Sequence, residues 1–389
     1  MSGKKKVAVI FGGQSSEHEV SRVSAESVLN NIDRNKFDVV MIGITKEGRW
    51  LNYNGPVEKL STGEWQAIAE AEVASGRRIS CGEAGKSDDG QTGVGSGQLT
   101  VNNSARRVLA VAGAENDNSG IDVVFPVLHG CNGEDGTIQG LFELAGIPYV
   151  GCGILGSALG MDKAYSKIIF EKEGIPQGKY VVLSRKEVNG DFESVCEKVE
   201  RVLEYPCFVK PSNAGSSVGV SKANDRKELK EALDTAARYD RRILVEEFIN
   251  GREIECAVLG NDEPIASTVG EIIPCNEFYD YQAKYIDNNS KCVIPADLPQ
   301  ETIQKIREYA VKAFKSLDCA GLSRVDFFVH KETGEIYINE INTLPGFTSI
   351  SMYPKLWEAS GIPYKELIER VIELALERYE DNKREINRD

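Results

Sequence analysis

The sequence contains few of the residues that bind zinc, and none of them stands at a metal-binding spacing. Its 389 residues include only three histidines and nine cysteines. The cysteines are scattered singly, without a CxxC pair, and their number is odd. Such a set is typical of reduced thiols in a cytoplasm. We therefore expect a cytoplasmic protein without a zinc site.

Long hydrophobic runs and an excess of basic residues are also absent. No apolar stretch approaches the roughly 18 residues that cross a membrane. The lysines at positions 4–6 lead directly into a short apolar run, which is not the pattern of a signal peptide. Asp and Glu number 60 against 46 Lys and Arg, which gives a net charge of −14. This balance argues against nucleic acid or an anionic membrane as the main partner. Any phosphate must therefore be bound by local basic residues.

The first apolar run, residues 7–11, ends at two glycines, as a buried parallel strand does. The spacing of the glycines lacks GxGxxG, so a dinucleotide site is weakly supported. Ser16 and Glu19 have the spacing of a capping box, which predicts a helix that continues to about residue 32. A strand, glycines and a helix N-terminus together form an anion-binding corner. Glu17 would lie in the first turn, where an acidic residue commonly offsets the helix dipole.

The length and composition predict two or three globular domains, and the alternation of strands and helices predicts an α/β fold. We expect domain boundaries that divide the chain into residues 1–150, 151–242 and 243–389. Residues 82–97 are rich in Gly, Ser and Asp and predict a mobile surface loop. The other predicted strands are residues 37–45, 121–128, 148–150, 180–183, 207–210 and 243–248. The other predicted helices are residues 137–145, 156–173, 191–203, 226–238, 300–316 and 364–384.

A loop rich in Gly and Ser, residues 211–220, follows the strand that ends at Lys210. It is not a P-loop, because GxxxxGK[ST] is absent. The backbone N–H groups of such a loop can still fold over phosphates as a flap, and the lysine directly before it favours that function. An ordinary hairpin loop remains the alternative.

Two runs rich in Val, Ile, Phe and Tyr flank a hydrophilic connection at residues 330–334, which predicts a β-hairpin. Because side chains alternate across a strand, Arg324 and Asp326 share one face of the first strand, and Glu340 and Asn342 share one face of the second. Paired strands would gather these groups on one surface. Carboxylate and amide oxygens suit magnesium, and an arginine can neutralise an anion beside it. A solvated face on an ordinary hairpin is the competing interpretation.

Residues 278–285 read FYDYQAKY, an aromatic segment without a clear strand or helix period. Such a segment in a polar surrounding indicates either a lid that excludes water or a locally packed Ω-loop.

Taken together, the motifs resemble the ATP-grasp ligases, and within them the D-alanine–D-alanine ligase branch. The resemblance covers residues 7 to about 376 and is carried by motifs in family order: GGxSxExxVS, HGxxGEDG, GSALGMDKAYSK, the Gly/Ser loop, FYDYQAKY and RVDFF…NEINTLPGFT. It implies a three-domain ATP-grasp fold with a Rossmann-like N-terminal domain and ATP bound between the second and third domains. Residues 52–118 match the family least securely.

The resemblance also implies roles for individual residues. The catalytic group is Glu17, Ser216, Tyr285, Arg324 and Gly346. Contacts to D-alanine come from His129, Lys284 and Ser351, although for His129 a purely structural role is an equal alternative. ATP is bound by Lys163, Lys210, Ser217, Glu246, Glu247 and Glu253. The metal ligands are Asp326, Glu340 and Asn342.

The implied reaction joins two D-alanines through an acyl phosphate, with ATP cleaved to ADP and phosphate, for peptidoglycan precursors. The expected cofactor is Mg²⁺, as two ions, with Mn²⁺ as a substitute and a monovalent cation as a candidate activator. The expected partners are D-alanine, ATP and a second copy of the chain in a homodimer. The alternatives are ligation to D-lactate or D-serine, another carboxylate–amine ligation, and a nucleotide-binding protein without turnover.

Overall fold

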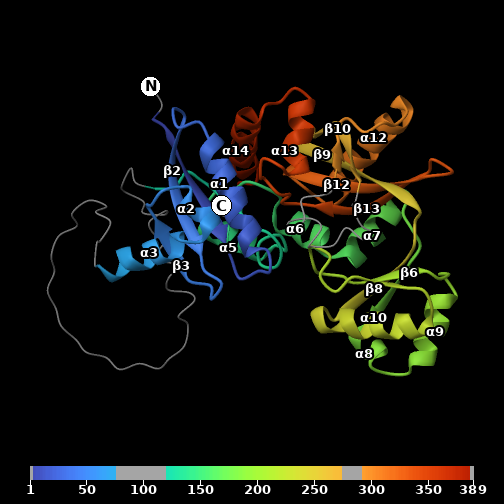
Figure 1. Ribbon diagram of the computed structural model, residues 1–389. Coiled ribbons are helices and arrows are strands. Elements are labelled where there is room, and N and C mark those ends of the chain that lie inside the picture. The colour runs from blue at the N-terminus through green and yellow to red at the C-terminus, as the bar shows by residue number, and fades with distance from the viewer. Residues whose placement is uncertain (1–2, 76–119, 274–290, 386–389) are drawn as a thin grey trace, which may run out of the picture.

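The computed structural model of the chain describes residues 3–75, 120–273 and 291–385. These residues form three β-sheets with helices packed on them, which is the α/β architecture expected from the sequence (Figure 1). The loop predicted at residues 82–97 and the lid predicted at 278–285 lie outside the described residues. Among the helices in the described part, none combines the length and the apolar character needed to cross a membrane.

The N-terminal sheet has the strand order β3-β2-β1-β4. β1 pairs in parallel with both β2 and β4, and α1 connects β1 to β2, so the predicted βαβ unit is confirmed. The strand predicted at 148–150 is reduced to a single bridge between Val124 and Tyr149, because the chain turns away at Gly151, where φ is +105°. The elements are β1 Lys5–Gly12, α1 His18–Asn31, β2 Phe37–Ile44, β3 Trp50–Tyr53, α2 Lys59–Thr62, α3 Trp65–Ala74, β4 Val123–Val127 and α5 Thr137–Ala145.

The predicted capping box at the start of α1 is wrong. The helix begins at His18, its N-cap is Glu17, and no side chain caps it. Ser15, one residue before the expected cap, accepts a hydrogen bond through Oγ from the N–H of Glu17 at 3.1 Å. The helix therefore begins one residue later than the spacing of Ser16 and Glu19 predicts, and Glu17 is its N-cap.

The helix predicted at 156–173 is divided into α6 Ile154–Met161 and α7 Lys163–Lys172. Asp162 between them has an extended backbone, with φ −89° and ψ 96°. Its carboxylate accepts a hydrogen bond from Ser212 at 2.6 Å and pairs with Arg242. These tertiary contacts hold the break, and they make Lys163 the first residue of a new helix.

The middle sheet has the strand order β5-β8-β6-β7, and its hydrophobic core is its own. All its pairings are antiparallel, and the Gly/Ser loop connects β6 to β7 as expected. β8 belongs to this sheet by its pairing, and the division of the chain at residues 150 and 242 stays a prediction. The elements are β5 Tyr180–Ser184, α8 Arg185–Val188, α9 Phe192–Glu200, β6 Cys207–Pro211, β7 Ser221–Ala223, α10 Arg226–Tyr239 and β8 Arg242–Glu247.

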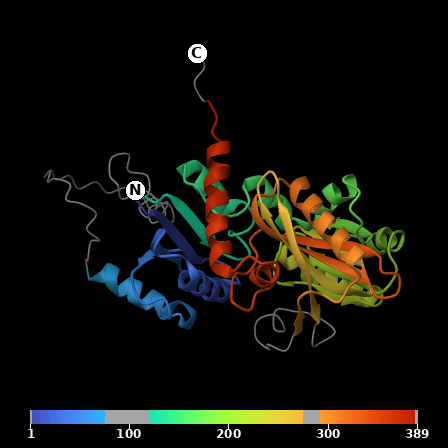
Figure 2. The ribbon, with the colours of Figure 1, turned by 90° about the horizontal axis from the view of Figure 1, so that it is seen from above.

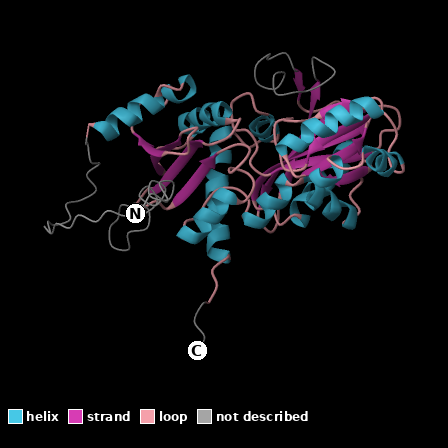
Figure 3. Ribbon diagram, turned by 90° about the horizontal axis from the view of Figure 1, so that it is seen from below, coloured by secondary structure: helices cyan, strands magenta, loops and turns pink. Residues whose placement is uncertain are grey.

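The C-terminal sheet is antiparallel throughout, in the order β11-β10-β9-β12-β13. The predicted hairpin is β12–β13. One face of the sheet packs with α12, while α13 and α14 pack with the other (Figure 3). The elements are β9 Gly251–Gly260, β10 Ile265–Ile273, β11 Lys291–Val293, α12 Gln300–Ser316, β12 Gly321–His330, β13 Ile336–Asn342, α13 Met352–Ala359 and α14 Tyr364–Asp381.

Helix α14 packs between the N-terminal and C-terminal sheets (Figure 2). Its buried residues Leu367 and Val371 belong to the same hydrophobic core as Val7 of β1. Arg378 donates hydrogen bonds to the carbonyls of Gly151 at 2.7 Å and Tyr149 at 3.1 Å. The first and last parts of the chain therefore share one core, which fixes the position of the N-terminal sheet relative to the hairpin.

Candidate active site

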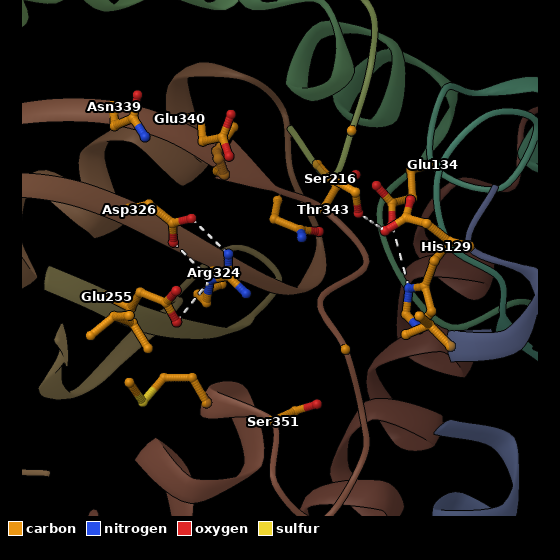
Figure 4. A pocket seen from close by; sticks show the side chains of 18 of the residues that line it. His129, Glu134, Ser216, Glu255, Arg324, Asp326, Asn339, Glu340, Thr343 and Ser351 are labelled. Carbon is orange, nitrogen blue, oxygen red and sulfur yellow. Dashed lines mark hydrogen bonds and ion pairs between the residues drawn. The ribbon is translucent and has the colours of Figure 1, made fainter. Parts of the chain in front are cut away.

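A cavity of about 560 Å³ is lined by segments from all three parts of the chain: the start of α1, the Gly/Ser loop, and strands β9, β12 and β13 (Figure 4). Lys284 and Tyr285 lie outside the described residues. Lys210, Ser217, Glu246 and Glu247 are not part of the cavity wall. Most of the other residues that the sequence singles out line the cavity: Glu17, His129, Lys163, Ser216, Glu253, Arg324, Asp326, Glu340, Asn342, Gly346 and Ser351.

The hairpin β12–β13 forms one wall of the cavity. Its register places Arg324 opposite Asn342 and Asp326 opposite Glu340. Residues directly opposite on antiparallel strands have Cβ atoms about 5 Å apart. All four alternate with buried apolar residues such as Val325, so they share one face of the hairpin. The structure thus brings together the guanidinium, the two carboxylates and the amide that the sequence places on one surface.

Arg324 lies between two carboxylates, and we refer to Arg324, Asp326 and Glu255 as the hairpin cluster (Figure 4). Its Nε and Nη2 donate to the two oxygens of Asp326, each at 2.7 Å, which is a bidentate pair. Its Nε also lies 3.1 Å from Oε2 of Glu255 on β9. Burial disfavours the charge on Arg324, but the carboxylates outweigh burial and raise its pKa well above the ordinary value. The guanidinium is therefore fixed in orientation as well as charged.

Lys163 connects the hairpin to the Gly/Ser loop. Its ammonium lies 3.3 Å from Oε2 of Glu340 and donates to the carbonyl of Ala214 at 2.8 Å. The break between α6 and α7 makes this possible, because it places Lys163 at the start of a helix that faces both segments. Asn342, at the end of β13, accepts a hydrogen bond from the N–H of Leu344 at 3.1 Å.

Three charged side chains behind the cavity wall form a second cluster, Lys167, Lys210 and Glu246, which we call the lysine cluster. One carboxylate oxygen of Glu246 lies 2.6 Å from the Lys167 ammonium, and the other pairs with the Lys210 ammonium. Lys210 also donates to Oδ1 of Asn339, a cavity residue, at 3.5 Å. Burial favours the neutral form of Glu246, but the two lysines outweigh it and hold the pKa of Glu246 below its ordinary value. The cluster therefore contains an ionised carboxylate shared by two ammonium groups.

A side-chain contact connects the Gly/Ser loop to the start of α1. The hydroxyl of Ser216 donates a hydrogen bond to the carboxylate of Glu17, which is buried. Ser216 and Ser217 both have positive φ, 50° and 58°, a conformation that costs energy for residues other than glycine. Such strain is typical of functional loops that are held by their surroundings. The structure brings Glu17 and Ser216 together across the cavity, as the resemblance implies.

His129 is buried, and both of its ring nitrogens have partners. Nε2 lies 3.1 Å from the hydroxyl of Ser24, and Nδ1 lies 3.4 Å from Oε1 of Glu134 (Figure 4). Burial favours the neutral imidazole, but Glu134 and Glu17 outweigh burial and raise the pKa of His129 above its ordinary value. His129 is thus a satisfied structural residue that also lines the cavity, so both interpretations of this histidine find support.

The turn after β13 is held by Ser351. Its Oγ accepts a hydrogen bond from the N–H of Thr348 at 3.1 Å and bonds to the Thr348 hydroxyl at 2.7 Å. A Cβ at Gly346 would lie 2.9 Å from the same Oγ, so a larger residue there would displace Ser351. Glycine is therefore required for the close approach of this turn to α13.

The two remaining glutamates that the resemblance assigns to the nucleotide differ in position. Glu253 lines the cavity from β9, opposite Phe328 of β12. Glu247 pairs with the edge of the middle sheet instead: its Oε1 accepts a hydrogen bond from the N–H of Lys179 at 2.7 Å, and its N–H donates to the Lys179 carbonyl at 3.1 Å.

Three charged residues were not identified from the sequence: one in each of the two clusters, and the glutamate that contacts His129. Glu255 follows Glu253 at the period of a strand, which places both on one face of β9. Lys167 follows Lys163 by one helical turn in the segment DKAYSK. Glu134 stands within HGxxGEDG. Lys167 and Glu134 lie inside recognised motifs, and Glu255 lies two residues after the predicted site residue Glu253, so spacing relative to a known site residue could have identified each of them.

Comparison with known proteins accounts for almost the whole chain. Residues 6–152 match the family described as D-ala D-ala ligase N-terminus, and residues 169–373 match D-ala D-ala ligase C-terminus. The chain is 68% identical to the D-alanine--D-alanine ligase of Ruminiclostridium cellulolyticum over 98% of both chains. It is 66% identical to that of Acetivibrio thermocellus over 99% of both.

Solved structures agree with these matches. The VanG D-Ala:D-Ser ligase from Enterococcus faecalis is 41% identical, with a TM-score of 0.78 over 96% of this chain and 100% of that chain. The D-alanine-D-alanine ligase from Coxiella burnetii is 35% identical, with a TM-score of 0.75 over 97% of this chain and 95% of that chain. With its fold, its cavity residues and its sequence in agreement, the chain belongs to the D-alanine–D-alanine ligase family of ATP-grasp enzymes.

Proposed function

We propose that this protein joins two D-alanine molecules to form D-alanyl-D-alanine, with cleavage of ATP to ADP and phosphate, for peptidoglycan precursor synthesis. The observation that carries the proposal is the single cavity in which the hairpin residues, the Gly/Ser loop and Glu17 meet. A carboxylate is a poor electrophile because it is already negative. Transfer of the γ-phosphoryl group makes an acyl phosphate, which the amine of the second D-alanine attacks.

The residues of the cavity fit the two charges that this reaction must control. Glu17 is a buried carboxylate at the entrance of α1 and suits the ammonium of the first D-alanine. Arg324, with the N–H of Gly346, suits the oxyanion of the tetrahedral intermediate. Because Asp326 and Glu255 already fix the guanidinium, it needs little reorganisation when the negative charge develops.

The oxygen donors on the hairpin fit magnesium. Asp326 and Glu340 stand opposite each other in the register, with the amide of Asn342 on the same face, and carboxylate and amide oxygens are hard donors of the kind that Mg²⁺ takes. These three residues would hold the metal. A magnesium ion held there would supply positive charge that offsets the negative charge developing on the transferred phosphoryl group. Two ions, with Mn²⁺ as a substitute, and activation by a monovalent cation belong to this proposal.

We assign the nucleotide to the side of the cavity between the middle and C-terminal sheets. Lys163 and Lys210 would bind phosphates, with the backbone at Ser217 above them, and Glu253 would contact the ribose. Glu246 and Glu247 would lie at the adenine, Glu247 through its backbone. Lys284 and Ser351 would take the carboxylate of the second D-alanine, with His129 near the substrate. Tyr285 would join Glu17 and Ser216 when the lid closes over the acyl phosphate.

One specific alternative concerns which amino acid is the second substrate. The similar structure from Enterococcus faecalis is named a D-Ala:D-Ser ligase, so D-serine is a rival acceptor to D-alanine. Two relatives with 68% and 66% identity to this chain are named D-alanine--D-alanine ligases, which favours D-alanine. A nucleotide-binding protein without turnover is the remaining alternative, and the complete set of hairpin residues argues against it.

Phosphate release from ATP, measured with and without D-alanine, tests the proposal. We expect release that depends on D-alanine and on Mg²⁺, with D-alanyl-D-alanine as the product. Parallel reactions with D-alanine plus D-serine or D-lactate, resolved by chromatography of the products, identify the preferred acceptor. ATP binding without D-alanine-dependent release would contradict the ligase assignment. We further propose that the protein is cytoplasmic and forms a homodimer. Sedimentation of the purified protein checks whether it is a dimer.

A further inference from the structure

Lys167 carries a charge that the proposed reaction does not use. Only 2% of its side chain is exposed, and it is not part of the cavity wall. It lies on α7 one helical turn after Lys163, and its ammonium contacts Glu246 at 2.6 Å and lies 5.6 Å from the centre of the Tyr180 ring. A buried ion pair is weak support for stability, since its desolvation offsets much of the attraction. The burial of this lysine therefore points to a role other than stability.

The contacts form a line from Lys167 to the cavity. Glu246 lies between the two lysines and gives one oxygen to each of them. Lys210 extends from Glu246 to Asn339, which stands beside Glu340 on the cavity wall (Figure 4). In the part of the chain that the structure describes, these contacts connect Lys167 to the cavity through Glu246 and Lys210.

The charge of this arrangement depends on Lys167. Two ammonium groups share one carboxylate, so the lysine cluster has one positive charge in excess. Without Lys167, Glu246 would pair with Lys210 alone and neutralise it. Buried charges interact strongly because the surroundings have a low dielectric constant. A polyphosphate near Lys210 would then meet a neutral pair instead of a positive cluster.

We propose that Lys167 is a positioning residue for the nucleotide, which shares Glu246 with Lys210 and so keeps the Lys210 ammonium available to the polyphosphate. The proposal rests on the proposed function in one respect, that Lys210 faces the phosphates of ATP. The pKa of Glu246 lies below its ordinary value and that of Lys210 above it, after the ion pairs have outweighed burial. Glu246 and Lys210 thus favour their charged forms, whereas burial lowers the pKa of Lys167 below its ordinary value against the attraction of Glu246, and the contact of 2.6 Å with Glu246 is what supports the charge on Lys167.

The test compares Lys167→Met with Lys172→Met. Lys172 is exposed at the end of the same helix, so the control removes an equal charge outside the cluster. Binding of ADP and of adenosine to each purified variant is measured by titration calorimetry. We expect Lys167→Met to weaken ADP binding by about tenfold or more, to change adenosine binding little, and to raise KM for ATP more than KM for D-alanine. Lys172→Met should resemble the unaltered protein.

A second variant separates charge from packing. Lys167→Met combined with Glu246→Gln leaves Lys210 as the single charge of the cluster and restores its positive excess. Because Glu246 is also assigned to the adenine, the double variant is compared with Glu246→Gln alone: the loss of ADP binding caused by Lys167→Met should be smaller in the Glu246→Gln background than in the unaltered protein, and thermal unfolding of each variant reports on the fold. Equal losses for ADP and adenosine in Lys167→Met, unchanged ADP binding, or an equal effect of Lys167→Met in both backgrounds would overturn the proposal. Because binding is measured without turnover, the ADP-binding results could still be interpreted if the unaltered protein did not ligate D-alanine.

Discussion

The hairpin cluster and the lysine cluster are two triads of opposite composition at one cavity, and the side chains of both are largely buried. The hairpin cluster has one guanidinium and two carboxylates, whereas the lysine cluster has two ammonium groups and one carboxylate. One therefore has a negative and the other a positive charge in excess. The negative excess suits a divalent cation, and the positive excess suits phosphates. The proposed binding of ATP by a chain of net charge −14 would therefore depend on a local excess of positive charge.

A third triad shows that composition alone does not make a site. Arg226 pairs with Glu193 at 2.8 Å and with Glu200 at 2.6 Å. These are the same kinds of group as in the hairpin cluster, but Arg226 is 47% exposed and solvent screens its charge. Arg324 lies on an inner strand of its sheet and is covered by neighbouring elements. This position limits screening of its charge by solvent and fixes its orientation.

Removing a carboxylate from the hairpin cluster should have the largest effect. Asp326→Asn keeps the shape of the side chain but removes the charge of a proposed metal ligand and breaks its bidentate pair with Arg324. We expect D-alanine-dependent phosphate release to fall by about 100-fold or more, with the fold retained. Glu340→Gln should act similarly, and EDTA should abolish release until Mg²⁺ is restored. Near-normal release by both variants would contradict the metal assignment.

Matched substitutions of glutamate should distinguish the two buried clusters by stability. Glu246→Gln leaves two buried ammonium groups without an anion, and we expect it to lower the free energy of unfolding by about 3–5 kcal/mol. Glu255→Gln leaves the bidentate pair of Arg324 and Asp326 intact, and the expected loss is only about 1–2 kcal/mol. Urea denaturation of both variants measures the difference. Equal losses would show that the two glutamates do not differ in this way.

The stability contributed by Glu246 should depend on pH in a defined direction. Its native pKa lies below the ordinary value of 4.5 because Lys167 and Lys210 outweigh burial. A depressed carboxyl pKa contributes stability that is fully present above 4.5 and is lost as the pH falls through the native pKa. The difference in unfolding free energy between the unaltered protein and Glu246→Gln should therefore be largest above about pH 5 and should narrow in acid. A constant difference would exclude Glu246 as the titrating group.

The exposed triad should give the smallest effect. The hydrogen bonds from Arg226 lower the pKa of Glu200, and Glu200→Gln removes the charge of this carboxylate. The pair is nevertheless open to solvent and is screened by salt. We expect unchanged phosphate release and a denaturation midpoint close to that of the unaltered protein, with any difference vanishing at high salt. A loss comparable to that of Glu255→Gln would mean that burial is not what separates the triads.

The sequence predicted the hairpin cluster better than the lysine cluster for a physical reason. Arg324 and Asp326 lie two residues apart on one strand, and strand periodicity alone places them together. Lys167 and Glu246 meet only because α7 packs beside β8, a tertiary contact that no local period specifies. The resemblance supplied Lys210 and Glu246 as ATP residues, but it did not indicate that they share a charge with Lys167.

The errors in the predicted secondary structure also arise from tertiary contacts that no local pattern specifies. Strands and helices defined by their own apolar pattern were found close to their observed ends, among them α12 and the hairpin strands. The break at Asp162 depends on Ser212 and Arg242, which come from distant segments. At the start of α1, Ser15 accepts a hydrogen bond from the N–H of Glu17, which is the N-cap in place of Ser16. Neither feature follows from the local pattern of the sequence.

The core that α14 shares with β1 and β4 has a consequence for synthesis of the protein. The N-terminal sheet leaves the ribosome first, but the apolar surface that Leu367, Ile368 and Val371 cover stays exposed until more than 200 further residues have been translated. The middle sheet, whose core is its own, can fold while the N-terminal sheet still waits for its final helix. A nascent chain that stops before residue 364 would therefore present an uncovered apolar face, which is a target for chaperones and proteases.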